Sequence, residues 1–317
     1  MNWKKLGKIF DPTKFKLPNN CFEYAQSPQA LIFSDFIRIY FSSRERDEKG
    51  KYLSHVFYVD FDEEFKSVID VAKEEVIPLG DLGNFDEHGI FPMNVIRHKN
   101  TVLAYTTGWN RKISVSADAS IGLAISEDEG RHFNKVGSGP VMTASLNEPF
   151  LVCDAFVANF EERYNMWYIY GTKWIYDPKD FSPQRVYKIA YASSNDGINW
   201  NRDSRLIIPD KLNENECQAL PTVVYLEGKY HMFFCFREAF GFREHKERGY
   251  RIGYAFSLDM KTWVRDDENV GIETSVDGWD SNMLCYPHVF QFKGKVYMLY
   301  NGNEFGRFGF GLAELSI

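Results

Sequence analysis

The sequence predicts an all-β fold, a five-bladed β-propeller, because one short pattern recurs five times along the chain. Each copy opens a strand at a proline or an alanine, and the steps between these landmark residues are 64, 63, 66 and 66 residues. Near-equal steps of this length indicate a repeat architecture. Five four-stranded units in a closed ring leave no open sheet edge, so residues 1–317 are predicted to form one domain. The landmarks are Pro28, Pro92, Ala155, Pro221 and Pro287.

The other strands of each unit are predicted from composition. An aromatic and β-branched second strand follows the landmark strand, and a third strand combines small and aromatic residues, which favours strands. The second strands are expected at Ile37–Arg44, Thr101–Trp109, Asn165–Lys173, Lys229–Arg237 and Lys295–Asn303. The third strands are expected within Ser120–Phe133, Tyr187–Trp200, Tyr250–Trp263 and Phe308–Ile317.

Three of the third strands lead into a turn of the form S-x-D-x-x-x-[WF]. Its acidic residues are Asp128, Asp196 and Asp259. An aspartate at this position can accept hydrogen bonds from its own turn backbone, and Gly130 and Gly197 can adopt a positive φ. We interpret these turns as structural rather than functional.

The last unit lacks an outer strand of its own, because the sequence given stops at its third strand. The N-terminal segment Asn2–Phe10 resembles Asn199–Pro209, a predicted outer strand. Since sheets tolerate open edges poorly, the N-terminal strand is predicted to complete the last blade.

Amino-acid composition limits which binding partners and which cellular location are expected. The formal net charge of −7 argues against nucleic acid and anionic membranes as partners. The chain has neither a signal-peptide-like apolar run at its start nor a stretch long enough for a membrane helix, so a cytoplasmic location without membrane insertion is expected. Five cysteines without a C-x-x-C pair are predicted to be free buried thiols. No phosphate-binding glycine loop and no metal-ligand spacing appears, so neither a cofactor nor a metal is predicted.

Acidic residues precede the landmark strands, which in a propeller places them around the mouth of a central funnel. The loops after the second strands should bring arginine and tryptophan side chains to the same end. Carboxylates and arginines can bond sugar hydroxyls, and aromatic rings can pack on sugar faces, so a carbohydrate ligand is expected. Two arginines at one mouth also suggest an anionic group in the ligand. The predicted substrate-binding residues are Asp280, Arg237, Arg44, Trp109 and Trp279.

The repeat, the aspartate turns and the placement of the acids resemble the five-bladed propeller glycosidases of glycoside hydrolase family 43 and their relatives in families 32, 62 and 130. Three stretches resemble more closely the glycosidase-like proteins of bacterial surface-polysaccharide gene clusters: YRIGYA from Tyr250, GWDSNMLCYP from Gly278 and MLYNGNEFG from Met298. The resemblance covers the whole chain.

This resemblance implies catalytic roles for carboxyl groups. Asp154, in CDAFV, matches the family's pKa-tuning aspartate, and Glu216, in NEC, matches its general acid. One carboxyl must protonate the departing glycosidic oxygen while another activates water or attacks the sugar. Ser27 stands where the family has its basic aspartate, and a serine cannot be that base. Glu87 or Glu23 is therefore predicted to supply it.

The expected function is that of a glycoside hydrolase-like enzyme acting on an oligosaccharide or glycoconjugate. Two alternatives stay open. The arginines at the funnel mouth and the expected cytoplasmic location favour a glycosyltransferase or glycoside phosphorylase on the same fold. Ser27 in the position of the base favours a propeller that binds carbohydrate without turning it over. The sequence does not indicate the oligomeric state.

Overall fold

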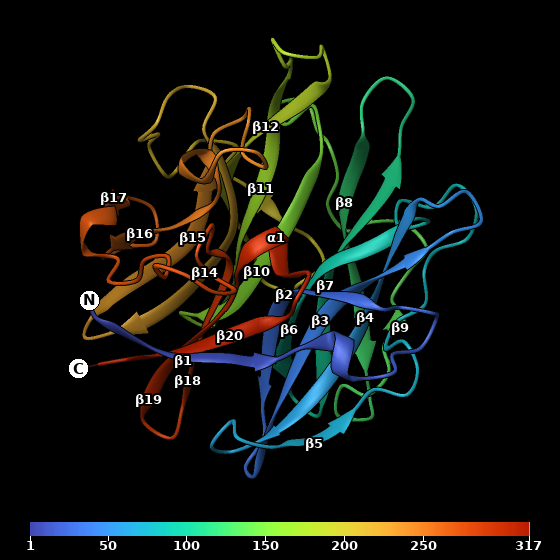
Figure 1. Cartoon of the computed structure of the whole chain (residues 1–317), viewed down its shortest axis with the longest axis vertical. Coiled ribbons are helices and arrows are strands. Elements are labelled where there is room, and N and C mark those ends of the chain that lie inside the picture. The colour runs from blue at the N-terminus through green and yellow to red at the C-terminus, as the bar shows by residue number, and fades with distance from the viewer. Residues whose placement is uncertain (317) are drawn as a thin grey trace.

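The computed structural model describes residues 1–316 and consists almost entirely of antiparallel β-strands (Figure 1). Ile317, the predicted end of the last strand, lies outside the described residues. The alternation of buried and exposed side chains is weak in the inner strands, because both of their faces pack against neighbouring sheets. Sandwiched sheets of this kind explain why the repeats are so rich in aromatic residues.

The first half of the chain forms a hydrogen-bonded sheet of eight strands in two groups of four. A single parallel pair, Ser54 with Gly89, joins β4 to β6. The strands are β2 (Glu23–Ile32), β3 (Phe36–Arg46), β4 (Tyr52–Asp62), β5 (Val68–Val71), β6 (Gly89–His98), β7 (Thr101–Arg111), β8 (Ala117–Ser126) and β9 (Asn134–Lys135).

The second half forms three separate four-stranded sheets. The first two contain β10 (Val152–Phe160), β11 (Arg163–Tyr176), β12 (Pro183–Ser194) and β13 (Asn201–Arg202), then β14 (Cys217–Leu226), β15 (Lys229–Arg237), β16 (Arg251–Ser257) and β17 (Val264–Arg265). The last contains β18 (Cys285–Phe292), β19 (Lys295–Asn301), β20 (Phe310–Leu315) and β1 (Trp3–Phe10). Short helical turns occur at Pro12–Lys14, Lys246–Arg248, Asp267–Asn269 and α1 (Asn303–Gly306).

The N-terminal strand belongs to the last sheet, as predicted. In Figure 1, β1 runs beside β20, and the two pair antiparallel from Trp3 opposite Leu315 to Phe10 opposite Phe310. The last sheet also packs against the first, where the rings of Phe65 and Tyr297 lie 5.2 Å apart. The two ends of the chain are therefore tied together by hydrogen bonds and by packing.

The aspartate turns are structural, as predicted. Asp128 accepts hydrogen bonds from the backbone of Arg131 and His132, and Asp259 accepts them from Lys261 and Thr262. The turn glycines have φ of +82° at Gly130 and +74° at Gly197. A tyrosine hydroxyl from the preceding repeat bonds each of these glycine carbonyls, at 2.7 Å and 2.9 Å. The turns thus fasten neighbouring repeats together.

All five cysteines are buried and unpaired, which confirms the prediction of free thiols. Burial raises the thiol pKa of Cys21 to about 12 and that of Cys153 well above its ordinary value. In the described part of the chain, no helix is long and apolar enough to cross a membrane.

Candidate functional site

The residue before each landmark has an unusual backbone conformation. The strand register shifts at these points, and φ is positive in four of the five repeats. A non-glycine residue in this region costs on the order of 1–3 kcal/mol, so the surroundings must enforce it. Side chains of adjacent sheets do so, since Asn301 accepts from the backbone N–H of Ser27 and Thr107 from that of Asp154, both at 2.8 Å. The four residues are Ser27 (+52°), Asp154 (+56°), Leu220 (+48°) and Tyr286 (+58°).

These positions meet in space. Phe91, at the same place in the second repeat, has its ring 5.4 Å from that of Tyr286 in the fifth. The backbone N–H of Leu220 lies near enough to the carboxyl group of Asp154 to act on its pKa. Residues from different repeats thus converge from different sheets. We call the region formed by Ser27, Phe91, Asp154, Leu220 and Tyr286 the central site.

Asp154 is the titratable carboxyl of the central site. Its side chain is buried, at 8% exposure for the residue. Burial raises the pKa of Asp154 to about 7, against an ordinary value of 3.8, although the Leu220 N–H and the charge of Arg185 act in the opposite direction. A carboxyl with this pKa can carry a proton at neutral pH and donate it, which is the property required of a general acid.

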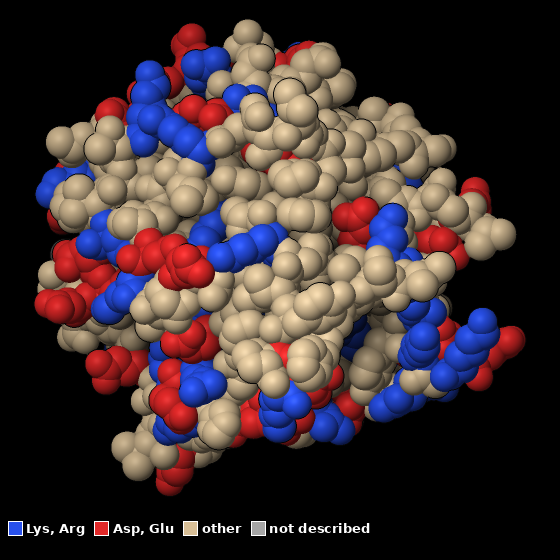
Figure 2. All heavy atoms as spheres, turned by 90° about the horizontal axis from the view of Figure 1, so that it is seen from above, with Lys and Arg blue, Asp and Glu red and all other residues tan. Residues whose placement is uncertain are grey.

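Four arginines lie around the central site without carboxylate partners of their own among residues 1–316. Arg44 donates to Gln26 and Ser54, Arg185 to Ser116, and Arg237 to backbone carbonyls and a tyrosine. Arg243 lies with its guanidinium 4.2 Å from the ring centre of Phe242. On the face displayed in Figure 2, by contrast, basic and acidic side chains are interspersed.

Of the four arginines, Arg237 is buried among aromatic rings and has an unpaired donor. It is 4% exposed, and its guanidinium lies between aromatic rings, 3.6 Å from that of Phe242 and 5.4 Å from that of Tyr250. It donates to the hydroxyl of Tyr187 at 2.9 Å, but its Nε has no partner. Burying a cation without an opposing charge is costly, and orphaned buried donors are rare in native proteins. An anion supplied by a ligand would satisfy both requirements.

A second polar corner lies next to Phe91. The Arg44 guanidinium is 5.4 Å from the Phe91 ring centre and donates to Ser54 Oγ at 2.7 Å. Trp109 Nε1 donates to the same Ser54 oxygen at 3.1 Å. The hydroxyl of Ser27 is buried and has no partner. Two of the predicted binding residues, Arg44 and Trp109, are therefore joined through one serine.

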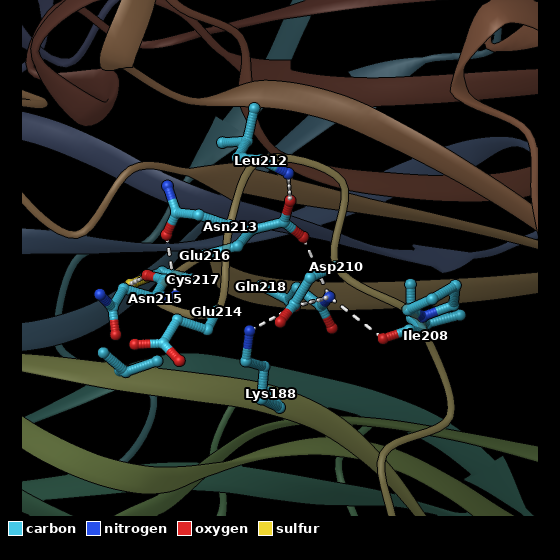
Figure 3. Close-up of polar contacts among 12 residues, drawn as sticks. Lys188, Ile208, Asp210, Leu212, Asn213, Glu214, Asn215, Glu216, Cys217 and Gln218 are labelled. Atoms are coloured by element: carbon cyan, nitrogen blue, oxygen red, sulfur yellow. Dashed lines mark hydrogen bonds and ion pairs between the residues drawn. The ribbon is translucent and has the colours of Figure 1, made fainter.

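Glu216, predicted to be the proton donor, occupies a different kind of site (Figure 3). It is fully buried and accepts hydrogen bonds from the backbone of Leu212 and from Gln218, both at 3.0 Å. Arg265 on β17 donates to it at 2.6 Å. Burial alone raises the pKa of Glu216, but the Arg265 pair and the other donors outweigh it and hold the pKa below its ordinary value. This carboxylate keeps its charge at neutral pH, which does not suit a general acid.

The same ion pair recurs in four repeats. In each, an acid ahead of the inner strand pairs with a basic residue on the outermost strand of the same four-stranded group. Such a pair fastens the loop between two repeats to the outermost strand of the four-stranded group. These acids therefore point towards the sheet, whereas the sequence predicted that they would point towards the mouth of the funnel. The pairs are Asp86–Lys135 at 2.6 Å, Glu148–Arg202 at 2.7 Å, Glu216–Arg265 at 2.6 Å and Asp280–Lys5 at 2.7 Å. The predicted binding residue Asp280 thus has a structural partner.

The remaining predicted residues make local contacts. Glu23 pairs with Arg307 at 2.8 Å, and Glu87 accepts from the backbone of Gly83 within its own loop. Trp279 stacks on Tyr300 at 5.2 Å. None of the three makes a described contact with Asp154.

Sequence reasoning missed Arg185, Arg243, Tyr187 and Tyr250. The alternation of Arg185 and Tyr187 along β12 puts both on one face of that strand, which was a usable signal. The hydroxyls of Tyr187 and Tyr250 are 2.6 Å apart, so side chains from the third and fourth repeats together surround Arg237.

No known family model matches the chain. Two proteins of Mycobacterium tuberculosis, "Uncharacterized protein MT1551" (strain CDC 1551 / Oshkosh) and "Uncharacterized protein Rv1502" (strain ATCC 25618 / H37Rv), are each 34% identical to it over 320 residues, covering 99% of both sequences.

Solved structures of glycoside-active enzymes share the fold. A thermostable family-43 glycoside hydrolase has a TM-score of 0.69 at 15% identity, over 95% of this chain and 92% of that one. A β-1,2-mannobiose phosphorylase from Listeria innocua, in complex with β-1,2-mannobiose, has a TM-score of 0.71 at 11% identity, over 100% and 97%. An exo-1,5-α-L-arabinanase from a bovine ruminal metagenomic library has a TM-score of 0.65 at 13% identity, over 96% of both. The resemblance to glycosidase-like proteins is confirmed at the level of fold.

Proposed function

We propose that this chain, which belongs to the same family as Rv1502 of Mycobacterium tuberculosis, cleaves a glycosidic bond with phosphate in place of water, as a glycoside phosphorylase. One observation carries the proposal: a single protonatable carboxyl, Asp154, shares the central site with four arginines that lack carboxylate partners within residues 1–316.

We further infer that the four-stranded groups are five blades of one propeller domain. The eight-stranded sheet divides naturally in two, because one parallel pair alone connects β4 to β6. Packing of the first sheet against the last supports a closed ring. In this arrangement the residues before the five landmarks would line the central funnel.

Hydrolysis is less well supported than phosphorolysis. Retaining and inverting hydrolases both need two carboxyl groups, about 5–5.5 Å or about 6.5–9.5 Å apart. No other carboxylate acts on the pKa of Asp154 among the described residues, and Glu216 and Asp280 are held in ion pairs. The position of the expected base is taken by Ser27, whose hydroxyl has no partner. Phosphate removes the need for a base because it brings its own charged nucleophilic oxygen.

The arginines suit such a co-substrate. Guanidinium groups bind phosphate through paired, charge-assisted hydrogen bonds, and their charge is worth more where water is excluded. Arg237 offers an unused Nε–H, and burial together with the neighbouring charges of Arg237 and Arg185 lowers the pKa of Arg243. A dianion would relieve this repulsion.

The proposed step is a displacement at the anomeric carbon by a phosphate oxygen. A phosphate oxygen forms a bond to the anomeric carbon while the bond from that carbon to the glycosidic oxygen breaks. The electron pair stays on the departing oxygen, which takes the proton from Asp154. The products are a sugar 1-phosphate and a saccharide with a free hydroxyl, and Asp154 then regains a proton from solvent. The known fold permits this chemistry, since one structural neighbour is itself a phosphorylase.

The test runs the reaction in reverse. The protein is incubated with a panel of sugar 1-phosphates and acceptor sugars, and inorganic phosphate is measured. We expect phosphate release that requires both donor and acceptor and is lost in Asp154→Asn. Cleavage of a disaccharide at the same rate without phosphate would indicate a hydrolase instead. Transfer that requires a nucleotide sugar would indicate a glycosyltransferase, and tight binding without turnover would indicate a carbohydrate-binding propeller.

A further inference from the structure

A cavity of about 530 Å³ lies between the second and third repeats, and one of its lining residues, Leu151, is three residues before Asp154 in the chain. Its walls come from the hairpin between β7 and β8, from the segment that leads into β10, and from β11. They include Arg111, Lys112, Asp118, Phe150 and Trp174. Its volume falls within the range of about 300–1,000 Å³ that is typical of small-molecule sites.

This cavity is connected to the central site through Arg185. Trp174 pairs with Arg185 across β11 and β12. Arg185 in turn donates a hydrogen bond to Ser116, in the hairpin that forms the opposite wall, at 3.2 Å. The charge of Arg185 also lowers the pKa of Asp154, so this arginine interacts both with a wall of the cavity and with the proton donor.

Two of the anion-binding arginines, Arg237 and Arg243, come from a different repeat from the one that contributes Asp154 and from those that build the cavity. Arg237 and Arg243 belong to the fourth repeat, whereas the cavity is built by the second and third. Asp154 belongs to the third. In a displacement at the anomeric carbon, the attacking and departing oxygens lie on roughly opposite sides of that carbon. With phosphate on the Arg237 side, the departing saccharide would extend towards the cavity.

The walls have the chemistry that a sugar requires. Trp174 is partly exposed and offers an indole surface, against which the apolar face of a sugar ring can pack. Lys112 and Asp118 form an ion pair at 3.4 Å, and because their side chains are 46% and 42% exposed, their solvent-facing atoms can also bond hydroxyl groups. Arg111 is held at 2.7 Å by Asp47, which fixes one edge of the cavity.

We infer that this cavity binds the saccharide that departs when the glycosidic bond breaks, with Trp174 as the surface on which its ring packs. The inference rests on the proposed function, because phosphorolysis sets the order in which phosphate, Asp154 and the departing saccharide lie across the site. Occupation of the cavity by a sugar can nevertheless be measured without turnover.

The first experiment follows the indole N–H signals of the seven tryptophans by NMR. The signal of Trp174 is the one missing from a Trp174→Phe variant. The ¹⁵N-labelled full chain is titrated with mannose, glucose, galactose and N-acetylglucosamine, each tested without phosphate. We expect at least one of these sugars to shift the Trp174 signal in a saturable way, also in Asp154→Asn. Absence of a saturable shift with all four sugars overturns the inference.

The second experiment uses the reverse reaction. Trp174→Ala should raise KM for the acceptor sugar about tenfold, equivalent to about 1.4 kcal/mol, and leave KM for the sugar 1-phosphate unchanged. Tyr176→Ala is the matched control, because Tyr176 lies on the same strand, is 69% exposed and does not line the cavity. An equal rise in both KM values, or the same rise in Tyr176→Ala, contradicts the assignment. A saturable shift of the Trp174 signal without phosphate-dependent turnover would support sugar binding in the cavity and refute the proposed phosphorylase activity.

Discussion

Replacing Asp154 by asparagine should stabilise the protein while abolishing its proposed activity. The pKa of Asp154 is about 7 in the folded chain, against 3.8 ordinarily, because the carboxyl is buried. Between about pH 4 and pH 7 the folded state therefore holds a proton that the unfolded state has lost. By proton linkage, stability falls as the pH rises through this window, and asparagine, which has no proton to lose, escapes the loss.

The size of the effect follows from the shift. A shift of about 3.2 pKa units at about 1.36 kcal/mol each limits the penalty to about 4.4 kcal/mol; about 4.3 kcal/mol of it is present at pH 8 and about 1.6 kcal/mol at pH 5. The advantage of Asp154→Asn should thus grow by about 2.7 kcal/mol between pH 5 and pH 8. With an unfolding entropy of about 2 cal/mol/K per residue, this corresponds to a change in Tm difference of about 4 °C.

The assay is thermal unfolding of both proteins at pH 5, 6, 7 and 8, at one scan rate. Asp259→Asn is the control of opposite sign. Backbone N–H groups of Thr262 and Lys261 lower the pKa of Asp259 to about 2, so its contribution is fully present from pH 5 to pH 8 and is lost only as the pH falls below about 4. Asp259→Asn should therefore lower Tm by an amount that stays constant across the four pH values. A Tm difference between Asp154→Asn and the parent that does not change with pH would refute the reasoning, because it would mean that Asp154 is ionised at an ordinary pKa.

Other predictions concern the ion pairs, the arginines, the pH profile and the thiols. Glu216→Gln should destabilise the fold by about 1.5–3 kcal/mol in chemical denaturation, since it removes one of the two carboxylate partners of the buried Arg265 and leaves it only Asp267, while activity per folded molecule stays within about twofold. Loss of turnover with unchanged stability would instead restore Glu216 as the general acid. Arg237→Met should raise KM for phosphate about 10- to 100-fold, the value of one or two charge-assisted hydrogen bonds, with a smaller effect on KM for the saccharide. Equal effects on both would contradict an anion site at Arg237. In the direction of glycoside cleavage, kcat/KM should fall as the pH rises through about 7, because Asp154 then loses the proton that it must donate. A thiol reagent should modify none of the five cysteines before unfolding and all five afterwards, and rapid labelling of the native chain would contradict their burial.

Much of the fold could be predicted because its signals are local or repeated. The landmark spacing located the inner strands, and the likeness of Asn2–Phe10 to an outer strand predicted the pairing of β1 with β20. Strand boundaries were less accurate, since β11 continues to Tyr176, three residues past the expected Lys173. That extension carries Trp174 into the wall of the cavity and forms the hairpin that presents Arg185.

The candidate site was predictable only in part. Asp154 could be placed because it immediately precedes a landmark, where the backbone turns the side chain towards the centre. Glu216 is predicted to be the general acid from its match to the family pattern, whereas its ion-pair partner, Arg265, lies 49 residues later on a two-residue strand that carries no sequence pattern. The burial that raises the pKa of Asp154 and the lack of carboxylates beside Arg237 are properties of side chains from several repeats together. Neither can be inferred from the spacing of residues in the chain.

The measurement that tests the account most directly is a crystal structure of the protein grown at pH 6 in phosphate, with Arg237→Met as its comparison. The account predicts a phosphate ion that accepts a hydrogen bond from Arg237 Nε, lies within reach of Arg185 or Arg243, and is absent from the Arg237→Met crystal. A central site without phosphate, or with a carboxylate of the protein against Arg237, would contradict the claim that an anionic co-substrate binds beside Asp154.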